Sequence, residues 1–377
     1  GTVTVTTVGV EDGQAVTITL NSATYTANVS SNSATVTITA SGLQALTSGQ
    51  TYTLTADVSD AAGNAAAQVT SSSFTVDTTA PTITSVTSTT NDGTYNETDT
   101  VNVTVTFSEA VTLDGGNLVV TLETGDTDRT VTFETITSAS TASGTYTVQA
   151  GDTSSDLTVS GIALSAGTLK DAGGNAMSSF TIGSNLAASS ALVIDTTAPT
   201  VTGVDSSTDA GTYIADQAIS IQVTFSETVN VTGTPQLTLE TGASDAVVDY
   251  ASGSGSSILT FTYTVGAGNT SSDLDYASTT ALALNGGTIK DVGGNNATLT
   301  LATPGAAGSL AANEALVVDT TAPTVTGVDS STNNGTYIAD QAISIQVTFS
   351  ETVNVTGTPQ LTLETGASDA VVDYASG

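Results

Sequence analysis

The feature that most constrains this chain is that its last part copies its middle. Residues 319–377 repeat residues 195–253 with only two changes, at Asp209 (Asn333 in the copy) and Ala210 (Asn334 in the copy). A third, diverged copy starts earlier, and the motif DTTAP opens the three copies with periods of 118 and 124 residues, at Asp77, Asp195 and Asp319. Such periods are too long for a solenoid, and each fits one β-sandwich of about 100 residues. We therefore predict tandem domains in an extended array.

The strand pattern predicts that every domain is all-β. In the copy that starts at Asp195, alternating apolar and polar residues form stretches such as AISIQVTF, QLTLE and ILTFTYTV, and turn residues separate them. Seven such strands in one copy match an immunoglobulin-like β-sandwich. Thr, Ser, Val, Ala and Gly dominate the composition, and β-branched residues favour strands over helices.

The repeats divide the chain into four expected segments. Residues 1–76 read as an immunoglobulin-like domain that lacks its first strand. Residues 77–194 and 195–318 are two complete immunoglobulin-like repeats, and residues 319–377 are the first half of a further, truncated repeat. Because the chain starts and stops out of phase with its own repeat, we expect it to be a window from a longer protein. The half-repeat would expose strand edges and half a core unless neighbouring chain completes it.

The charge balance restricts the partners of the chain. Its 36 acidic residues face only three basic ones, which gives a net charge of -33 and an isoelectric point near 4.1. Such a surface repels nucleic acids and anionic lipids, so we expect neither as a partner. Cations from solution can neutralise it, and Ca²⁺ prefers carboxylate oxygens. The alternative, that acidity serves only solubility or salt tolerance, stays open.

Missing residue types exclude several kinds of chemistry. The chain has no Cys, no His and no Trp. Disulfides, cysteine-based zinc sites and the common catalytic triads are therefore excluded. No stretch approaches the roughly 20 apolar residues of a membrane span. Paired carboxylates are plentiful, but none is set apart from its mate by aromatic neighbours, so we expect no glycosidase and no other enzyme.

Acidic residues recur at fixed positions and predict metal sites. The Asp of DTTAP precedes the Glu of VTFSE by 32 residues in every copy, and a D-x-G-G-N loop follows in the complete repeats. In an antiparallel sandwich, the start of the domain, the end of the second strand and this loop lie at the same pole. We predict that they bind Ca²⁺ together, because three converging carboxylates need a cation. The predicted residues are Asp77, Glu109, Asp171 and Asn175; Asp195, Glu227, Asp291 and Asn295; and Asp319 and Glu351.

Alternative interpretations of these acids stay open. Asp-x-Gly-Gly-Asn also makes a good hairpin turn without a metal, and the linker Asp can hydrogen-bond a turn. In the first segment Asp57, Asp60 and Asn64 occupy the corresponding loop, but no matching linker Asp or strand-end Glu is evident. Acids at the opposite pole could add ligands across a junction; among them are Asp92, Asp99, Asp152 and Asp275. Lys170 and Lys290 directly precede the loop Asp and are candidate ion-pair partners for it.

Several phrases resemble a known class of repeats. SDAAGN and FTVDTTAP in the first segment, with VTFSE, KDAGGN or KDVGGN and DTTAP in the later ones, are similar to bacterial immunoglobulin-like tandem repeats of large secreted surface adhesins. The resemblance covers essentially the whole chain. It implies an extracellular, cell-surface protein of bacteria, in which Ca²⁺ often stiffens the repeats.

Two functions follow as hypotheses. The first is a non-enzymatic, Ca²⁺-stiffened extender of a surface adhesin, involved in cell adhesion or biofilm, whose partners are the neighbouring repeats of the same long chain. The second is a structural subunit of a self-assembling extracellular fibre, sheath or surface layer, in which copies of the chain bind one another. Imaging of native material separates them, because an adhesin gives single threads and a fibre gives filaments of many chains.

Overall fold

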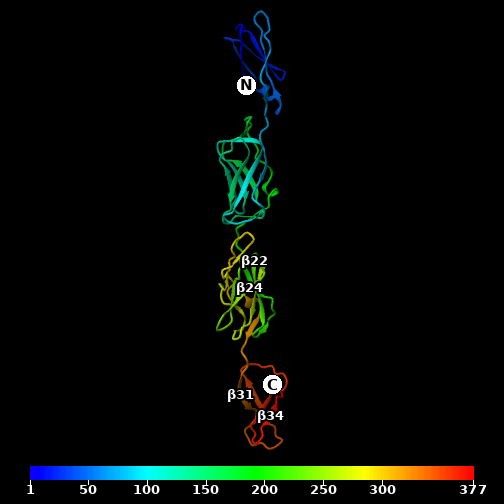
Figure 1. Ribbon diagram of the computed structural model, residues 1–377, viewed down its shortest axis with the longest axis vertical. Coiled ribbons are helices and arrows are strands. Elements are labelled where there is room, and N and C mark those ends of the chain that lie inside the picture. The colour runs from blue at the N-terminus through cyan, green and yellow to red at the C-terminus, as the bar shows by residue number, and fades with distance from the viewer. The chain divides into compact units, whose positions relative to one another are not determined.

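The computed structural model describes residues 1–377 and consists almost entirely of β-strands (Figure 1). Helix is confined to three short elements, α1 (Ala40–Gln44), the 3-10 helix η1 (Leu186–Ala188) and α2 (Leu310–Asn313). The predicted all-β class is confirmed. None of the helices has the length and apolar character that a membrane crossing requires.

The chain separates into two compact units. One comprises residues 1–198 with residues 292–295, and the other comprises residues 199–291 with residues 296–377. Buried apolar side chains form separate clusters, one within residues 83–194 and one within residues 204–318, and two smaller clusters lie in the first segment. The boundaries of the four segments expected from the repeats stay predictions.

The first segment has three sets of paired strands around its small clusters. A four-stranded sheet has the order β3-β2-β6-β7, and two further pairs are β1-β4 and β5-β8. The strands are β1 (Thr2–Thr6), β2 (Ala15–Leu20), β3 (Ala23–Asn28), β4 (Ser33–Thr37), β5 (Thr51–Tyr52), β6 (Thr55–Asp57), β7 (Val69–Thr70) and β8 (Phe74–Thr75).

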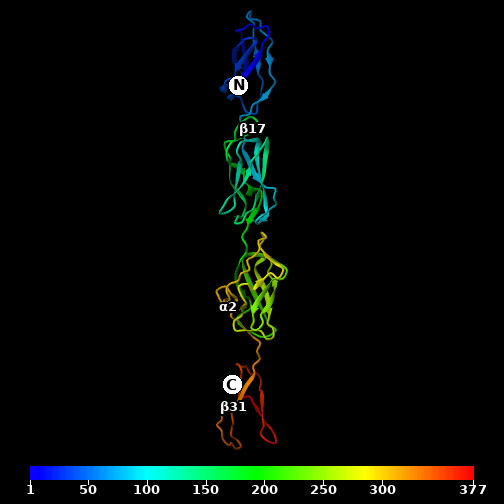
Figure 2. The ribbon, with the colours of Figure 1, turned by 90° about the vertical axis from the view of Figure 1, so that its left-hand side faces the viewer.

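Residues 77–194 form layered sheets around one core (Figures 1 and 2). The largest sheet has the order β14-β11-β9-β18, with β17 paired to β11, and the others are β13-β12-β16 and β10-β19-β15. The strands are β9 (Ile83–Thr87), β10 (Gly93–Tyr95), β11 (Thr100–Asp114), β12 (Leu118–Glu123), β13 (Arg129–Phe133), β14 (Ala139–Thr147), β15 (Thr153–Ser154), β16 (Thr158–Leu164), β17 (Thr168–Asp171), β18 (Ile182–Ser184) and β19 (Leu192–Asp195).

Residues 195–318 repeat this plan. Strand β24 pairs with both β23 and β25, so a continuous path β20-β22-β25-β24-β23-β27 results, and β21-β30-β26 forms a small sheet. The strands are β20 (Val201–Ser206), β21 (Gly211–Tyr213), β22 (Ala218–Thr232), β23 (Gln236–Glu240), β24 (Ala246–Ser252), β25 (Ser256–Thr264), β26 (Thr270–Ser271), β27 (Asp275–Tyr276), β28 (Leu282–Ala283), β29 (Thr288–Lys290) and β30 (Leu316–Asp319).

The half-repeat after residue 319 contains only two strand pairs. Strands β31 (Val325–Ser330) and β32 (Ile345–Phe349) pair with each other, as do β33 (Gln360–Leu363) and β34 (Ala370–Asp373). Most of its apolar side chains are exposed.

Strict alternation in the long strand β11 builds the core of residues 77–194. Val101, Val103 and Val105 are fully buried, while the side chains between them are only partly so. Successive side chains of a strand point to opposite faces, so this pattern aims one face of β11 at the core. Strand β22 has the same burial pattern along its 15 residues.

A buried ion pair supports the loop before β15. The Asp152 side chain is 1 % exposed and accepts hydrogen bonds from Arg129 Nε at 2.7 Å, Tyr146 Oη at 2.7 Å and the Gln149 backbone N–H at 2.9 Å. Burial, and then the bond to Asp152, raise the pKa of Tyr146 far above its usual value. The Asp152 side chain is therefore part of the interior network, while its backbone oxygen accepts a hydrogen bond from Thr196 Oγ1 of the next linker at 3.0 Å.

The next repeat replaces this ion pair with neutral groups. Asn269 takes the place of Asp152, where its Oδ1 accepts from Tyr263 Oη at 2.9 Å and from the Gly266 N–H at 2.9 Å. Ala246 stands where the first complete repeat has Arg129. The charge of Asp152 and its cationic partner thus disappear together.

This exchange predicts a compensating double variant. Arg129→Ala leaves a buried carboxylate without its cation, and we expect a loss of about 3 kcal/mol, the lower end for a buried pair because the Arg129 side chain is partly exposed. Adding Asp152→Asn should recover most of this loss. Denaturant unfolding of the full chain measures both.

As a control, Lys170→Ala removes a pair with Asp114 that is 3.8 Å long and well exposed, and it should cost less than about 1 kcal/mol. An additive loss in the double variant would contradict the account.

Candidate metal centres

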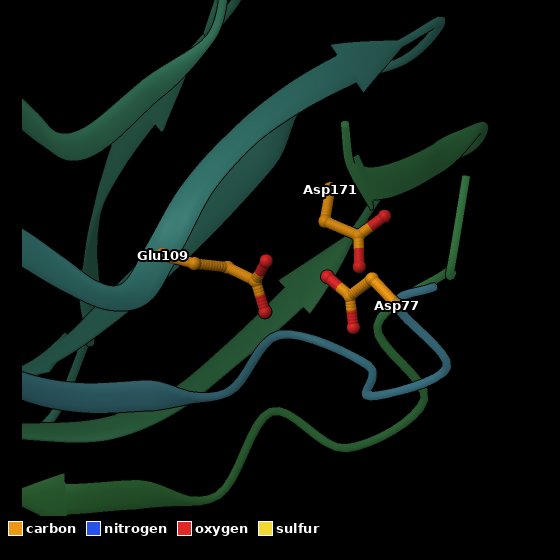
Figure 3. Close-up of side chains that lie close together, drawn as sticks. All are labelled: Asp77, Glu109 and Asp171. Carbon is orange, nitrogen blue, oxygen red and sulfur yellow. The ribbon is translucent and has the colours of Figure 1, made fainter. Parts of the chain in front are cut away.

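Three predicted residues of the first complete repeat converge. One carboxylate oxygen from each of Asp77, Glu109 and Asp171 lies within 4.8 Å of the other two. Figure 3 shows the three carboxylates turned toward one another from three separate segments of chain. Asp77 is exposed, Glu109 is half-buried and Asp171 is buried. The convergence of residues up to 94 positions apart, predicted from topology, is what the structure contains.

A β-bulge places Glu109. Strand β11 pairs with β14 and β9 up to Phe107, its register shifts in the stretch up to Val111, and from Val111 onward it pairs with β17. Glu109 lies inside this irregular stretch. A bulge re-aims side chains and lets a strand change partners, so the glutamate can point along the pole of the sandwich.

Asn175 holds Asp171 in place. Asp171 ends β17, and its two carboxylate oxygens accept hydrogen bonds from the Asn175 backbone N–H and from Asn175 Nδ2, both at 2.8 Å. Asn175 Nδ2 also donates to the Asp77 backbone oxygen at 3.1 Å. The amide nitrogen of Asn175 thus connects the loop to the linker. The bonds of its side-chain nitrogen give Asn175 a positioning role, and the prediction that it is also a ligand stays a prediction.

The linker residue Asp77 makes hydrogen bonds both with the first segment and with its own repeat. Its Oδ1 accepts from the Thr79 backbone N–H at 3.0 Å, which makes a local turn, and from Ser48 Oγ at 3.3 Å. Its backbone oxygen accepts from Asn175. The carboxylate still lies within the group of three. A cation bound there would add a bond between the linker and the body of the repeat.

The electrostatics single out Glu109. Burial raises its pKa above the usual value, and the charges of Asp171 and then Asp77 raise it further. Like charges at this separation repel, which disfavours ionisation of the third carboxyl group. The three carboxylates offer several hard oxygen ligands, which are the kind that Ca²⁺ prefers.

The next repeat carries the equivalent group of three, Asp195, Glu227 and Asp291. Asp291 is 4 % exposed, and Glu227 lies in the register shift of β22. Asn295 Nδ2 donates to the Asp195 backbone oxygen at 2.9 Å, as Asn175 does to Asp77.

Asp319 and Glu351 are not joined by a third carboxylate. The Asp319 side chain makes the same turn as its counterparts, accepting from the Thr321 N–H at 2.9 Å. The half-repeat has no D-x-G-G-N loop, so the buried Asp of the other sites has no equivalent here. Their role as metal ligands stays a prediction.

The first segment contains a related loop with a glutamate that sequence reasoning missed. Asp60 accepts from the Asn64 N–H and from Asn64 Nδ2, both at 2.8 Å, as Asp171 does from Asn175. Glu11 Oε2 accepts from the Ala61 N–H at 3.0 Å, so the Glu11 side chain lies against this loop. Glu11 stands outside a VTFSE motif, and only its position just before β2 could have indicated it. Asp57 instead binds Gln68 Nε2 at 2.9 Å.

Three other candidate acids, and Lys170, make hydrogen bonds or ion pairs outside the groups of three. Asp92 accepts from the Ala191 N–H at 2.8 Å, and Asp275 accepts from the Gly305 N–H at 2.8 Å. Asp99 accepts from the Asn96 N–H at 2.9 Å. Lys170 pairs with Asp114 on the neighbouring strand rather than with Asp171, because β17 and β11 are antiparallel neighbours there.

The raised pKa of Glu109 predicts a pH dependence in Ca²⁺-free protein. Because the folded state holds the Glu109 proton more tightly than the unfolded chain does, this residue lowers stability as pH rises through and above its usual pKa. Asp77→Asn removes one repelling charge and should lower the Glu109 pKa. A carboxyl NMR titration in chelator measures it, with Glu123→Gln as a control that should change nothing. An unchanged Glu109 pKa in the Asp77 variant would refute the coupling.

Solved structures that are similar to this chain include those of two bacterial adhesins. One is described as a Ca²⁺-stabilised adhesin that helps an Antarctic bacterium reach out and bind ice; it is 23% identical, has a TM-score of 0.38 and is matched over 99% of this chain and 83% of that chain. The other concerns host cell surface retention of a 1.5-MDa bacterial ice-binding adhesin, with 18% identity, a TM-score of 0.37 and matches over 78% of this chain and 87% of that chain. No protein-family model and no curated protein match. At these scores the similarity assigns no function.

Proposed function

We propose that this chain is a non-enzymatic, extracellular repeat segment of a bacterial surface adhesin, in which Ca²⁺ stiffens the repeats. The observation that carries the proposal is a group of three carboxylates that recurs in the two complete repeats. In each repeat the group includes the DTTAP aspartate that opens that repeat. A segment of this kind would hold an adhesive end-domain away from the cell and serve adhesion or biofilm formation.

The physical argument rests on where the ligands come from. Asp77 belongs to the linker, whereas Glu109 and Asp171 belong to the sandwich. Without a cation the three charges repel, and the hydrogen bond from Asn175 Nδ2 to the Asp77 backbone oxygen ties the linker to the repeat. With Ca²⁺ the repulsion becomes attraction, and the linker is tied to both sheet segments. Motion of the linker against its repeat then costs ligand bonds.

A second candidate function is a self-assembling fibre, sheath or surface layer. The near-identical copies at residues 195–253 and 319–377 favour it, because a repeated unit can itself be the building block of an assembly. The imaging test named above separates the two functions.

Ca²⁺ should stabilise the full chain through two sites. A ligand that binds only the folded form contributes RT ln(1 + [L]/Kd), about 2.7 kcal/mol at a hundredfold excess over Kd, so melting should rise by several degrees. We expect titration calorimetry to give two Ca²⁺ per chain, one for each group of three. Glu109→Gln should remove one site and leave the second.

The matched control is Glu240→Gln at the end of β23, which belongs to neither group of three, and it should keep both sites. Equal stoichiometry in the two variants, or equal melting with Ca²⁺ and with chelator, would overturn the assignment of Glu109.

Stiffening itself is measured by small-angle scattering. A single compact globule of 377 residues would have a radius of gyration of about 21 Å by the usual scaling. The proposal predicts a larger radius in Ca²⁺, with a broader distribution of distances after chelation. Identical profiles in Ca²⁺ and chelator would argue against stiffening even if Ca²⁺ binds.

A further inference from the structure

One hydroxyl group holds the linker that leaves the first complete repeat. Thr196, the first threonine of DTTAP, accepts a hydrogen bond at its Oγ1 from the Gly151 backbone N–H at 3.1 Å. The same hydroxyl donates to the Asp152 backbone oxygen at 3.0 Å. Both partners lie in the loop before β15. A threonine hydroxyl has one hydrogen to donate and can also accept, so the repeat that the linker is leaving uses both functions.

The next repeat makes the same contact. Thr320 Oγ1 accepts from the Gly268 N–H at 3.0 Å and donates to the Asn269 backbone oxygen at 2.9 Å. The loop residue changes from Asp152 to Asn269 between the two repeats, but the bonds go to the backbone and do not depend on this exchange. A contact that recurs with the same backbone partners is a feature of the repeat rather than of one loop.

The hydroxyl lies directly beyond the last paired residue. Strand β19 pairs on one side with β10 and on the other with β15, where Asp195 is opposite Thr153. Thr196 is the first residue after this strand and is half-buried, whereas Thr197 is exposed. The hydrogen bonds of Thr196 therefore extend the grip of the repeat on the chain by one residue past its last strand.

The following repeat takes hold of the chain a few residues later. The Pro199 side chain is buried, and its backbone oxygen accepts from the Thr298 N–H at 2.8 Å. Only Thr197 and Ala198 lie between Pro199 and the anchored Thr196. The boundary between the two compact units of the chain falls directly after Ala198.

The first segment reaches the same result with a different residue. Ser48 Oγ accepts from the Thr78 backbone N–H at 3.1 Å and donates to Asp77 Oδ1 at 3.3 Å. Here the hydroxyl belongs to the domain and the linker contributes its backbone. In both arrangements the linker is tied at the residue that follows the DTTAP aspartate.

We propose that Thr196 and Thr320 are positioning residues that fasten the linker to the repeat it leaves, and that bending after the first complete repeat is confined to Thr197 and Ala198. This anchor needs no cation, so it goes beyond the Ca²⁺-dependent stiffening proposed above. It keeps the DTTAP aspartate at the end of its strand with or without an ion. A ligand that is already in place loses less conformational freedom when an ion binds.

Exchange of the Gly151 amide measures the anchor directly, because the Thr196 hydroxyl is its hydrogen-bond partner. In the full chain, Thr196→Val keeps the size of the side chain but forms neither bond. We expect the Gly151 amide to exchange about tenfold faster or more, in Ca²⁺ and in chelator alike. The Gly268 amide, bonded to Thr320, is the reference within the same molecule and should not change. Thr196→Ser restores the hydroxyl and should restore the protection.

Backbone NMR relaxation in chelator locates the bend. In the unaltered chain, order parameters should be about 0.85 up to Thr196 and should fall at Thr197 and Ala198. In Thr196→Val the fall should extend back to Thr196 and Asp195, since the strand end has lost its anchor.

The matched control is Thr197→Val, which changes the adjacent, exposed side chain and should leave Gly151 exchange as it was. Equal Gly151 exchange in the two valine variants, or low order parameters at Thr196 in the unaltered chain, would overturn the proposal. Both measurements are made without an ion. Failure of the anchor therefore leaves the proposed Ca²⁺ sites standing, and a chain that binds no Ca²⁺ would leave the anchor standing.

Discussion

The change of partner along one strand underlies both the core and the candidate site. Strand β11 begins in the middle of a sheet, where Val101, Val103 and Val105 fill the core, and it ends beside β17 after a register shift. The shift brings the end of β17, and with it Asp171, alongside the stretch that carries Glu109. Strand β22 shifts at the equivalent place. A strand with uninterrupted pairing would leave the glutamate at a regular position on the sheet.

Hydrogen bonding separates the acids that support the fold from those that can bind a cation. Asp152 is neutralised by Arg129 and is bonded to Tyr146 inside the repeat. Asp171 is bonded on both oxygens to Asn175, and yet it also faces Glu109 and Asp77. Burial, and then the charges of Asp171 and Asp77, raise the pKa of Glu109. Three basic residues cannot offset 36 acids, so the compensation must come from solution.

The sequence predicted the parts of the structure that depend on periodicity. Alternation indicated strands such as β22 and β25, and the in-phase acids indicated the convergence of Asp77, Glu109 and Asp171, because antiparallel topology returns the chain to the same pole. It did not predict the full length of β22, since SETVNVT continues the strand only through a bulge that alternation cannot show. The parallel pairing of β21 with β30 was also missed, because it joins short segments about 100 residues apart.

Individual side-chain roles were harder to predict than positions. Lys170 precedes Asp171 in sequence but points to Asp114 across the sheet, as neighbours in a strand face opposite ways. Asp152 looked like a surface acid until its distant partner Arg129 was placed beside it. Glu11 carried no motif at all. Each depends on a contact between segments far apart in the chain, which a single sequence does not encode locally.

The most direct test of the central claim is the anomalous scattering of crystals grown with Ca²⁺. The account predicts an ion bound by oxygens of Asp77, Glu109 and Asp171 at about 2.3 to 2.6 Å, with 6 to 8 ligands in total. An ion that leaves out the linker residue Asp77, or no ion at all at millimolar Ca²⁺, would contradict it.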